Sequence, residues 1–171
     1  GCFKVGLYKQ GLLHDMSKYS PTEFWVGAKY YQGTRSPNNA EREDIGYSSA
    51  WLHHKGRNKH HYEYWIDYSM QALPGGMAPV PMPDKYIAEM IMDRIAASKV
   101  YMGGEYMDRS PLDYYYQGTD RAPIHPETKA KLLYVLEMLA EEGEEKTFRF
   151  IKKELVQQKR CMDWHQLKKA E

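Results

Sequence analysis

The sequence predicts an all-α protein, and three observations lead to this prediction. Apolar residues recur at helical spacing, most clearly at Ile87, Ile91 and Ile95. Prolines and glycines stand at the ends of such segments, where they start and stop helices. No run alternates polar and apolar residues as a β-hairpin would. At 171 residues the chain suits one domain over 1–171, with a C-terminal helical extension at 144–171.

The first half of the chain is expected to hold four helices. Residues 2–17 form the first. Ser20, Pro21 and Glu23 then supply a capping serine, a proline at the first helical position and the glutamate of a capping box, which starts a second helix that ends near residue 31. Two more helices are predicted over 41–55, ended by Gly56, and over 58–73, capped by Asn58.

The second half is expected to begin with a loop at 74–83, because this segment is rich in proline and glycine. A strong helix follows at 84–101, where Asp93 lies on the face beside the isoleucines and so borders the core. The last predicted helices are 111–116, capped by Ser110, and 126–142, which Gly143 separates from a charged helix that ends near 160.

Composition limits the partners and the compartment. A net charge of +1 provides no general electrostatic reason to bind nucleic acid or a membrane. No apolar stretch approaches the ~20 residues of a membrane helix, and no signal peptide is visible. Cys2 and Cys161 lack the spacing of a disulfide framework, which predicts a cytoplasmic protein. The 15 tyrosines suit a half-wet groove, a homo-oligomer contact or simple helix packing with exposed tips.

A cluster of histidines indicates a metal centre. His14 and Asp15 offer adjacent imidazole and carboxylate ligands for a divalent transition metal. The pairs His53-His54 and His60-His61 are expected to face one junction between helices. Asp93 also needs an explanation, because a carboxylate at a core is costly unless it is paired or binds metal.

These residues carry a resemblance to a known superfamily. Leu12-Leu13-His14-Asp15-Met16-Ser17-Lys18 resembles the second motif of the HD superfamily of metal-dependent phosphohydrolases, and Asp93 matches its last ligand. The resemblance implies an HD-domain-like helical bundle. Ser-Pro-Thr-Glu-Phe after the pair and Arg-Asn-x-His-His-x-Glu-Tyr-Trp later look closest to an uncharacterised bacterial HD-like family, over roughly 5–135.

One HD ligand has no counterpart, because no histidine precedes His14. Either an upstream segment that carries it is missing, which the start inside a helix favours, or the site is built differently. Some HD branches hold a second metal with further histidines. We choose His54 and His61 for this role, because each shares a helical face with aromatic residues. The resemblance thus implies that the metal ligands are His14, Asp15, His54, His61 and Asp93.

The remaining polar residues are assigned to catalysis or substrate binding. Lys18 could receive a phosphate, and Arg57 could bind further oxygens through its planar fork, beside Asn58. His53 and His60 are expected to donate protons or contact the substrate. Each assignment has a simpler rival: His14 and Asp15 as a helix cap, Asp93 as an ion pair with Arg94 or Lys99, and Lys18 as a solvated lysine. Glu63 is expected to be exposed.

The resulting expectation is a metal-dependent phosphohydrolase that acts on a small phosphorylated molecule, for example a nucleotide. It would hold one or two ions of Mn, Fe, Co, Ni or Zn. Two alternatives stay open. One is an HD-like diiron oxygenase, and the other is a non-catalytic ligand-binding domain that keeps the metal for stability.

Overall fold

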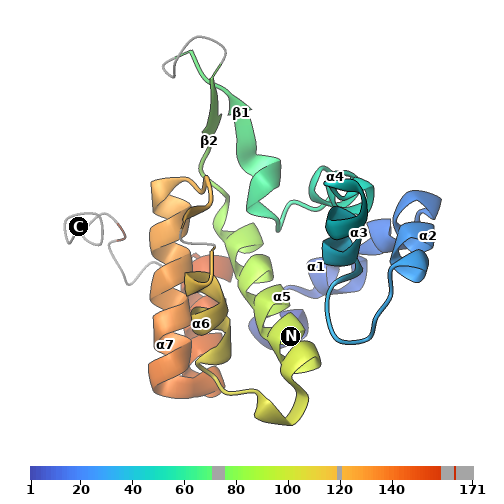
Figure 1. The fold of residues 1–171 in the computed structure, drawn as a ribbon. Coiled ribbons are helices and arrows are strands. Elements are labelled where there is room, and N and C mark those ends of the chain that lie inside the picture. The colour runs from blue at the N-terminus through green and yellow to red at the C-terminus, as the bar shows by residue number, and fades with distance from the viewer. Residues whose placement is uncertain (71–75, 119–120, 159–163, 165–171) are drawn as a thin grey trace.

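The structure, a computed structural model, describes residues 1–70, 76–118, 121–158 and 164 and is mainly helical (Figure 1). The all-α prediction is therefore confirmed in its coarse form. In the described part, no helix is long and apolar enough to cross a membrane. In chain order the elements are η1 (Cys2–Val5), α1 (Tyr8–Leu13), η2 (Met16–Tyr19), α2 (Pro21–Lys29), α3 (Pro37–Ile45), α4 (Ser49–Lys55), η3 (Tyr62–Trp65), β1 (Ile66–Tyr68), β2 (Met77–Pro79), α5 (Asp84–Met102), η4 (Gly103–Glu105), α6 (Ser110–Tyr116), α7 (Pro126–Phe150) and the π-helical η6 (Ile151–Val156).

The N-terminal segment is broken into three short helices, so the prediction of one helix over 2–17 is wrong. Gly6 has a φ of 87° and ends η1, a conformation that glycine adopts without steric cost. After α1, Asp15 is also left-handed, with a φ of 56°. His14 and Asp15 therefore lie in a turn between α1 and η2 instead of on a helix.

The second helix, α2, starts as predicted. The Ser20 side chain accepts a hydrogen bond from the backbone N–H of Glu23, at 3.4 Å. The Glu23 carboxylate, however, lies against His53 and His54 and not against the backbone that a capping box would use. The local signal predicted the helix start correctly, but Glu23 contacts histidines from another helix instead of capping its own.

Two helices, α3 and α4, replace the helix predicted over 41–55, because Gly46 adopts a φ of 83° and ends α3. Glu41 joins them, with only 2% of its surface exposed. Its carboxylate accepts hydrogen bonds from Ser48 Oγ at 2.6 Å and from Ser49 Oγ at 2.5 Å, at the start of α4. This carboxylate therefore fixes how α4 begins against α3.

The helix predicted over 58–73 does not form in its described part. Residues 62–65 make a 3-10 turn, and β1 then pairs antiparallel with β2 in a small sheet, Ile66 opposite Pro79. The expected absence of a β-hairpin is therefore also wrong, as is a loop throughout 74–83. Pairing with β2 satisfies the backbone here, and helical periodicity does not report such a partner. Residues 71–75 lie outside the described residues.

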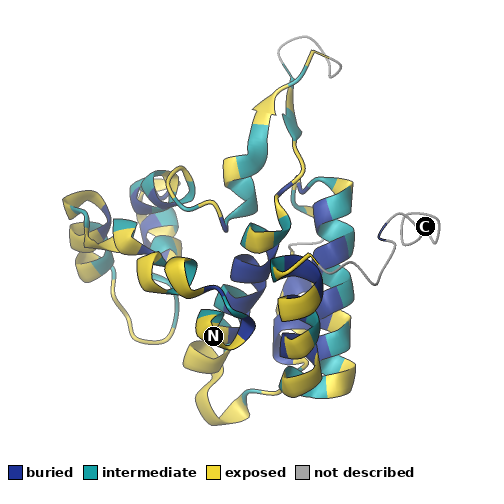
Figure 2. Ribbon diagram, turned by 180° about the vertical axis from the view of Figure 1, so that it is seen from behind, coloured by how far each residue is buried: buried dark blue, intermediate teal, exposed yellow. Residues whose placement is uncertain are grey.

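The main core lies between the long helices. Figure 1 shows α5 in the middle, with α6 and α7 on one side and α1 to α4 on the other. The isoleucines at 87, 91 and 95 are at most 2% exposed, as their spacing predicted. Buried residues concentrate on α5 and α7 in Figure 2, whereas α1 to α4 carry many exposed residues. The predicted break at Gly143 is present, with φ 79° and ψ 173°. The predicted end near 160 lies outside the described residues.

Candidate metal centre

The turn at His14 and Asp15 lies against α5. His14 Nε2 is 3.1 Å from Asp93 Oδ1, and His14 Nδ1 is 3.1 Å from Glu89 Oε1. Glu89 and Asp93 are four residues apart and so share one face of α5. On a straight helix two adjacent side chains diverge by about 100°. The left-handed backbone of Asp15 removes this divergence, so that both members of the pair face the same cluster.

Three more histidines converge on Asp15 from α4 and the loop that follows it. Asp15 Oδ1 lies 3.3 Å from His54 Nε2 and 3.3 Å from His60 Nε2. His61 Nε2 is 2.9 Å from His54 Nε2. Asp15, His54, His60 and His61 can each offer a donor atom so that all four atoms lie within 4.8 Å of one another. His14, His60 and Asp93 form a second group of this kind, which shares His60 with the first.

Two buried atoms in this cluster indicate what it is built to hold. Asp15 Oδ1 and His60 Nε2 are 3.3 Å apart, yet neither makes a hydrogen bond to any described residue. Unpaired buried polar atoms are costly, and native proteins rarely keep them. A tetrahedral metal with bonds of about 2.0–2.1 Å holds its ligands roughly 3.3 Å apart. The donor types and their spacing therefore fit a divalent metal ion.

Two glutamates orient the imidazoles. Glu89 Oε1 lies 3.1 Å from Nδ1 of His14 and 3.4 Å from Nδ1 of His60. Glu23 does the same for the α4 pair, 2.6 Å from Nδ1 of His53 and 2.8 Å from Nδ1 of His54. A carboxylate that accepts the Nδ1 proton leaves Nε2 free to bind metal. In His14, His54 and His60, Nε2 is the atom that faces the aspartates.

Sequence reasoning missed both glutamates as members of the centre. The sequence pattern predicts Glu23 as the last residue of a capping box and predicts no role for Glu89. A signal for Glu89 was present, because it lies one helical turn before Asp93 on the same face of α5. Glu23 carried no such signal, since its contacts with His53 and His54 cross about 30 residues of sequence.

The protonation states of the centre follow from its crowding. Burial alone would raise the pKa of Asp15, but the close imidazoles of His54 and His60 and the ammonium group of Lys18 hold it far below its usual range. Burial, with the neighbouring His60 and His54, lowers the pKa of His61 to about 3. An ionised aspartate and a neutral imidazole are the forms that bind metal.

His14 differs from His61. Burial lowers the pKa of His14, but hydrogen bonds to Asp93 and Glu89 outweigh this effect and raise it to about 10. In the absence of a metal a proton on His14 therefore compensates part of the carboxylate charge. A divalent ion would take over that compensation among Asp15, Asp93 and Glu89.

Not every predicted site residue joins the donor groups. His53 belongs to neither, because its ring turns toward Glu23. Lys18 pairs with Asp15 Oδ2 at 2.5 Å, while 63% of its side chain stays exposed. Asn58 donates to Ser17 Oγ at 2.7 Å and so ties the loop before His60 to η2. His60, for which the sequence predicts proton donation or substrate contact and not metal binding, lies within both donor groups.

The structure also differs from the expectations for Arg57 and Glu63. Arg57 is exposed and donates to the carbonyl oxygen of His53 at 3.3 Å, away from the cluster. Glu63 is half-buried, and its Oε2 is buried without a described partner, so the prediction of an exposed Glu63 is wrong. The helical face on which that prediction rested does not exist, because residues 62–65 form a 3-10 turn.

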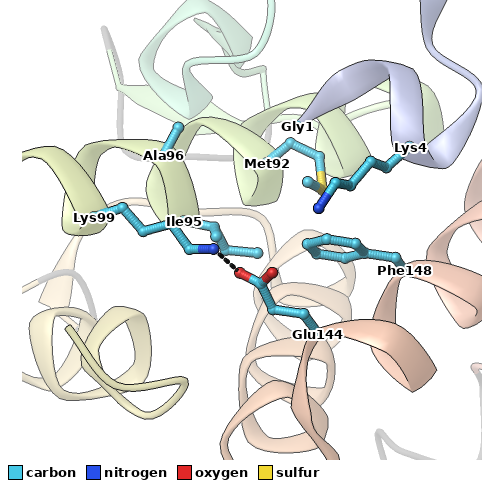
Figure 3. Close-up of a pocket in the computed structure, with 8 residues that line it drawn as sticks. All are labelled: Gly1, Lys4, Met92, Ile95, Ala96, Lys99, Glu144 and Phe148. Carbon is cyan, nitrogen blue, oxygen red and sulfur yellow. Dashed lines mark ion pairs between the residues drawn. The ribbon is translucent and has the colours of Figure 1, made fainter.

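A small pocket lies elsewhere, where η1, α5 and α7 meet (Figure 3). Lys99 pairs there with Glu144, and Lys4 lies over the ring of Phe148, 5.5 Å from its centroid. None of the residues that line this pocket belongs to the histidine cluster. The pocket is therefore separate from the candidate metal centre.

Fold and site together define a mainly helical protein with a buried histidine–aspartate cluster that could hold a metal ion. The chain belongs to a family of unknown function, DUF5662, whose model matches residues 1–138. That match includes every member of the cluster and ends within α7. No curated protein and no solved structure matches the chain.

Proposed function

We propose that the protein is a metal-dependent phosphohydrolase of small phosphorylated molecules, built as an HD-like helical bundle. One observation carries the proposal: the imidazole nitrogens of His54, on α4, and of His60, in the loop after it, converge on the buried Oδ1 of Asp15, which makes no hydrogen bond to a described residue. The resemblance of residues 12–18 to the HD motif supplies the reaction class. The upstream histidine that this resemblance predicts stays a prediction.

Asp15 is placed to serve both donor groups. Its Oδ1 faces His54 and His60, whereas its Oδ2 lies 3.5 Å from His14 Nε2 and contacts Lys18. A divalent ion held there would lower the pKa of a bound water toward ~7 and polarise a phosphoryl oxygen. Lys18, paired with Asp15 and mostly exposed, keeps a positive charge beside the donor groups, where it would attract an anionic substrate.

The test uses the full chain loaded with Mn²⁺, Co²⁺ or Ni²⁺ and a panel of phosphate monoesters, with release of inorganic phosphate as the readout. We expect metal-dependent turnover that a chelator abolishes. Asp15→Asn should lower turnover at least about 100-fold, because asparagine tolerates the left-handed backbone but lacks the charge. Asp67→Asn, an exposed position on β1, is the matched control. No turnover by protein shown to carry metal would overturn the proposal.

A diiron oxygenase is the second candidate, and the presence of two donor groups favours it. Asp15 could bridge two neighbouring ions, because its Oδ1 faces His54 and His60 and its Oδ2 faces His14, and mixed imidazole and carboxylate donors suit iron. Elemental analysis and oxygen uptake separate the two candidates. Two bound irons per chain with iron-dependent oxygen consumption, and no phosphate release, would replace the phosphohydrolase proposal.

A further inference from the structure

Ser17 and Asn58 make a hydrogen bond beside the candidate metal centre, although neither belongs to a donor group. Both residues are half-buried. Asn58 Nδ2 donates to Ser17 Oγ at 2.7 Å and to the carbonyl oxygen of His54 at 2.9 Å. A primary amide carries two N–H donors. Asn58 therefore has no side-chain N–H left to offer a substrate, although the sequence predicts it as a substrate-binding residue.

The direction of the Ser17 hydroxyl follows from its neighbours. Nδ1 of His54 lies 2.8 Å from Glu23 Oε2 and 3.1 Å from Ser17 Oγ. Because a carboxylate only accepts, Nδ1 of His54 carries the proton and donates it to the nearer, charged oxygen. Burial alone would raise the pKa of Glu23, but hydrogen bonds from His53, Ser17 and His54 lower it. Ser17 thus accepts from Asn58 and donates to the carboxylate that orients His54.

The same hydrogen bond joins three segments that carry members of the first donor group. Ser17 lies in η2, two residues after Asp15. Asn58 lies in the loop after α4, and its backbone carbonyl oxygen accepts from the backbone N–H of His61 at 3.1 Å. Its amide also contacts the last turn of α4 through the carbonyl oxygen of His54. The pair therefore links the turn, the helix and the loop without supplying a donor atom itself.

We propose that Ser17 and Asn58 are positioning residues, whose hydrogen bond holds Asp15 against the histidines before a metal ion binds. This inference rests on the metal centre of the proposed function and not on the reaction assigned to it. Asp15 Oδ1 lies 3.3 Å from His54 and from His60 but makes no hydrogen bond to a described residue. Neighbouring contacts must hold this arrangement together, and a preorganised site loses less conformational entropy on binding.

The test is a double-mutant cycle on Co²⁺ affinity, measured on the full chain by titration with visible absorption. Ser17→Ala and Asn58→Ala should each weaken Co²⁺ binding about 10-fold, because groups that orient metal ligands commonly contribute this much. The double variant should lose no more than about threefold beyond the weaker-binding single variant, since both substitutions break the same contact. Ser36→Ala and Asn39→Ala, at the start of α3, are the matched controls, with Co²⁺ affinity within about twofold of the wild type.

Wild-type Co²⁺ affinity in either single variant overturns the inference, even if its metal-free melting temperature falls, because a purely structural role has that result. Losses that multiply in the double variant also overturn it, because the two side chains would then act separately. If either alanine variant does not fold by circular dichroism, Ser17→Thr and Ser17→Val decide, because they share one shape and only threonine has a hydroxyl. Co²⁺ binding at least about threefold tighter in Ser17→Thr supports the inference, and equal affinities overturn it.

Metal binding and turnover together separate this positioning role from the proposed reaction. Coupled losses of Co²⁺ affinity in a protein that releases phosphate from none of the esters would reject the phosphohydrolase and keep the positioning role. Metal-dependent hydrolysis with independent losses in the two single variants would do the reverse.

Discussion

At the scale of single residues, the centre depends on how each imidazole is oriented. Glu89 contacts Nδ1 of both His14 and His60 through one oxygen, and Glu23 divides its two oxygens between His53 and His54. The left-handed Asp15 adds a conformation that non-glycine residues rarely adopt. Such backbone outliers persist where the surrounding contacts determine them, which is consistent with a functional centre.

Glu89→Gln should weaken Co²⁺ binding about 10- to 100-fold, because a neutral amide accepts the two Nδ1 protons poorly and releases both rings. The measurement is Co²⁺ titration followed by visible absorption, whose band positions report the ligand geometry. Glu137→Gln, an exposed position on α7, is the matched control. Equal Co²⁺ affinities in the two variants would show that Glu89 does not position the histidines.

At the scale of elements, two junctions set how helices meet. Glu41 of α3 accepts hydrogen bonds from the first residues of α4, which carries His54. Burial alone would raise the pKa of Glu41, but these hydrogen bonds from Ser48 and Ser49 hold it below 4.5. In α7, Gly143 interrupts the helix with a positive φ, and Thr147 Oγ1 donates to its carbonyl oxygen at 2.8 Å.

Glu41→Gln should lower the free energy of unfolding by about 1–3 kcal/mol at pH 7, because a buried charge-assisted network is weakened. Because the pKa of Glu41 is lower in the folded state than in the unfolded state, its ionised carboxylate stabilises the fold fully at pH values above the unfolded pKa, near 4.5. This stabilisation is lost as the pH falls through the pKa of the folded state. The difference between wild type and variant should therefore shrink below pH 4.5. Urea unfolding from pH 3 to 7 checks this, and a difference that grows toward acid would contradict it.

Gly143→Ala and Gly27→Ala should change stability in opposite directions. Alanine at 143 would keep a strained positive φ and place Cβ 3.3 Å from Asp108 Oδ2, which costs about 1–3 kcal/mol. Gly27 lies within α2 with nothing within 4 Å of an added Cβ, so alanine should stabilise by about 0.5–1 kcal/mol. Thermal unfolding of the metal-free protein measures both, and the same sign for both would reject this account of the α7 kink.

At the scale of the whole molecule, the candidate centre joins two parts with different packing. The residues of α5 and α7 form most of the buried core, whereas α1 to α4 expose many large side chains (Figure 2). Asp15 and the histidines come from the second part and from the loop that follows α4, and Glu89 and Asp93 come from α5. A metal ion bound among them would tie the less buried part to the core.

Metal loading should therefore raise the melting temperature by roughly 10 °C at a free metal concentration ~1,000 times Kd, since ligand binding then adds about 4 kcal/mol. His60→Ala should abolish this shift, because His60 lies in both donor groups. His125→Ala, at the cap of α7, should lower stability but keep the shift. Differential scanning calorimetry with and without a chelator checks this. A full shift together with no turnover would favour the non-catalytic, metal-stabilised alternative.

Local patterns in the sequence were sufficient to predict those elements that are stabilised by interactions within a single helix. Ser20 and Pro21 predicted the start of α2, and the isoleucine spacing predicted the buried face of α5, because capping and amphipathic periodicity act within one helix. The same patterns were wrong where Gly46 divides 41–55 and where residues 66–68 pair with β2 instead of continuing a helix. The HD-like motif likewise predicted that His14, Asp15 and the later histidines belong to one metal centre.

Only the tertiary structure decided how those candidates meet. Glu89 contacts His14 across 75 residues of sequence, and Glu23 contacts His54 across 31. The turn at 56–61 packs on Asp15. This packing places His60 in both donor groups and leaves Arg57 at the surface. Such contacts depend on how helices dock and on how buried charges are compensated, and these are properties of the assembled core. The sequence by itself determined which residues could bind metal, and the docking of α2, α4 and α5 determined which of them lie together.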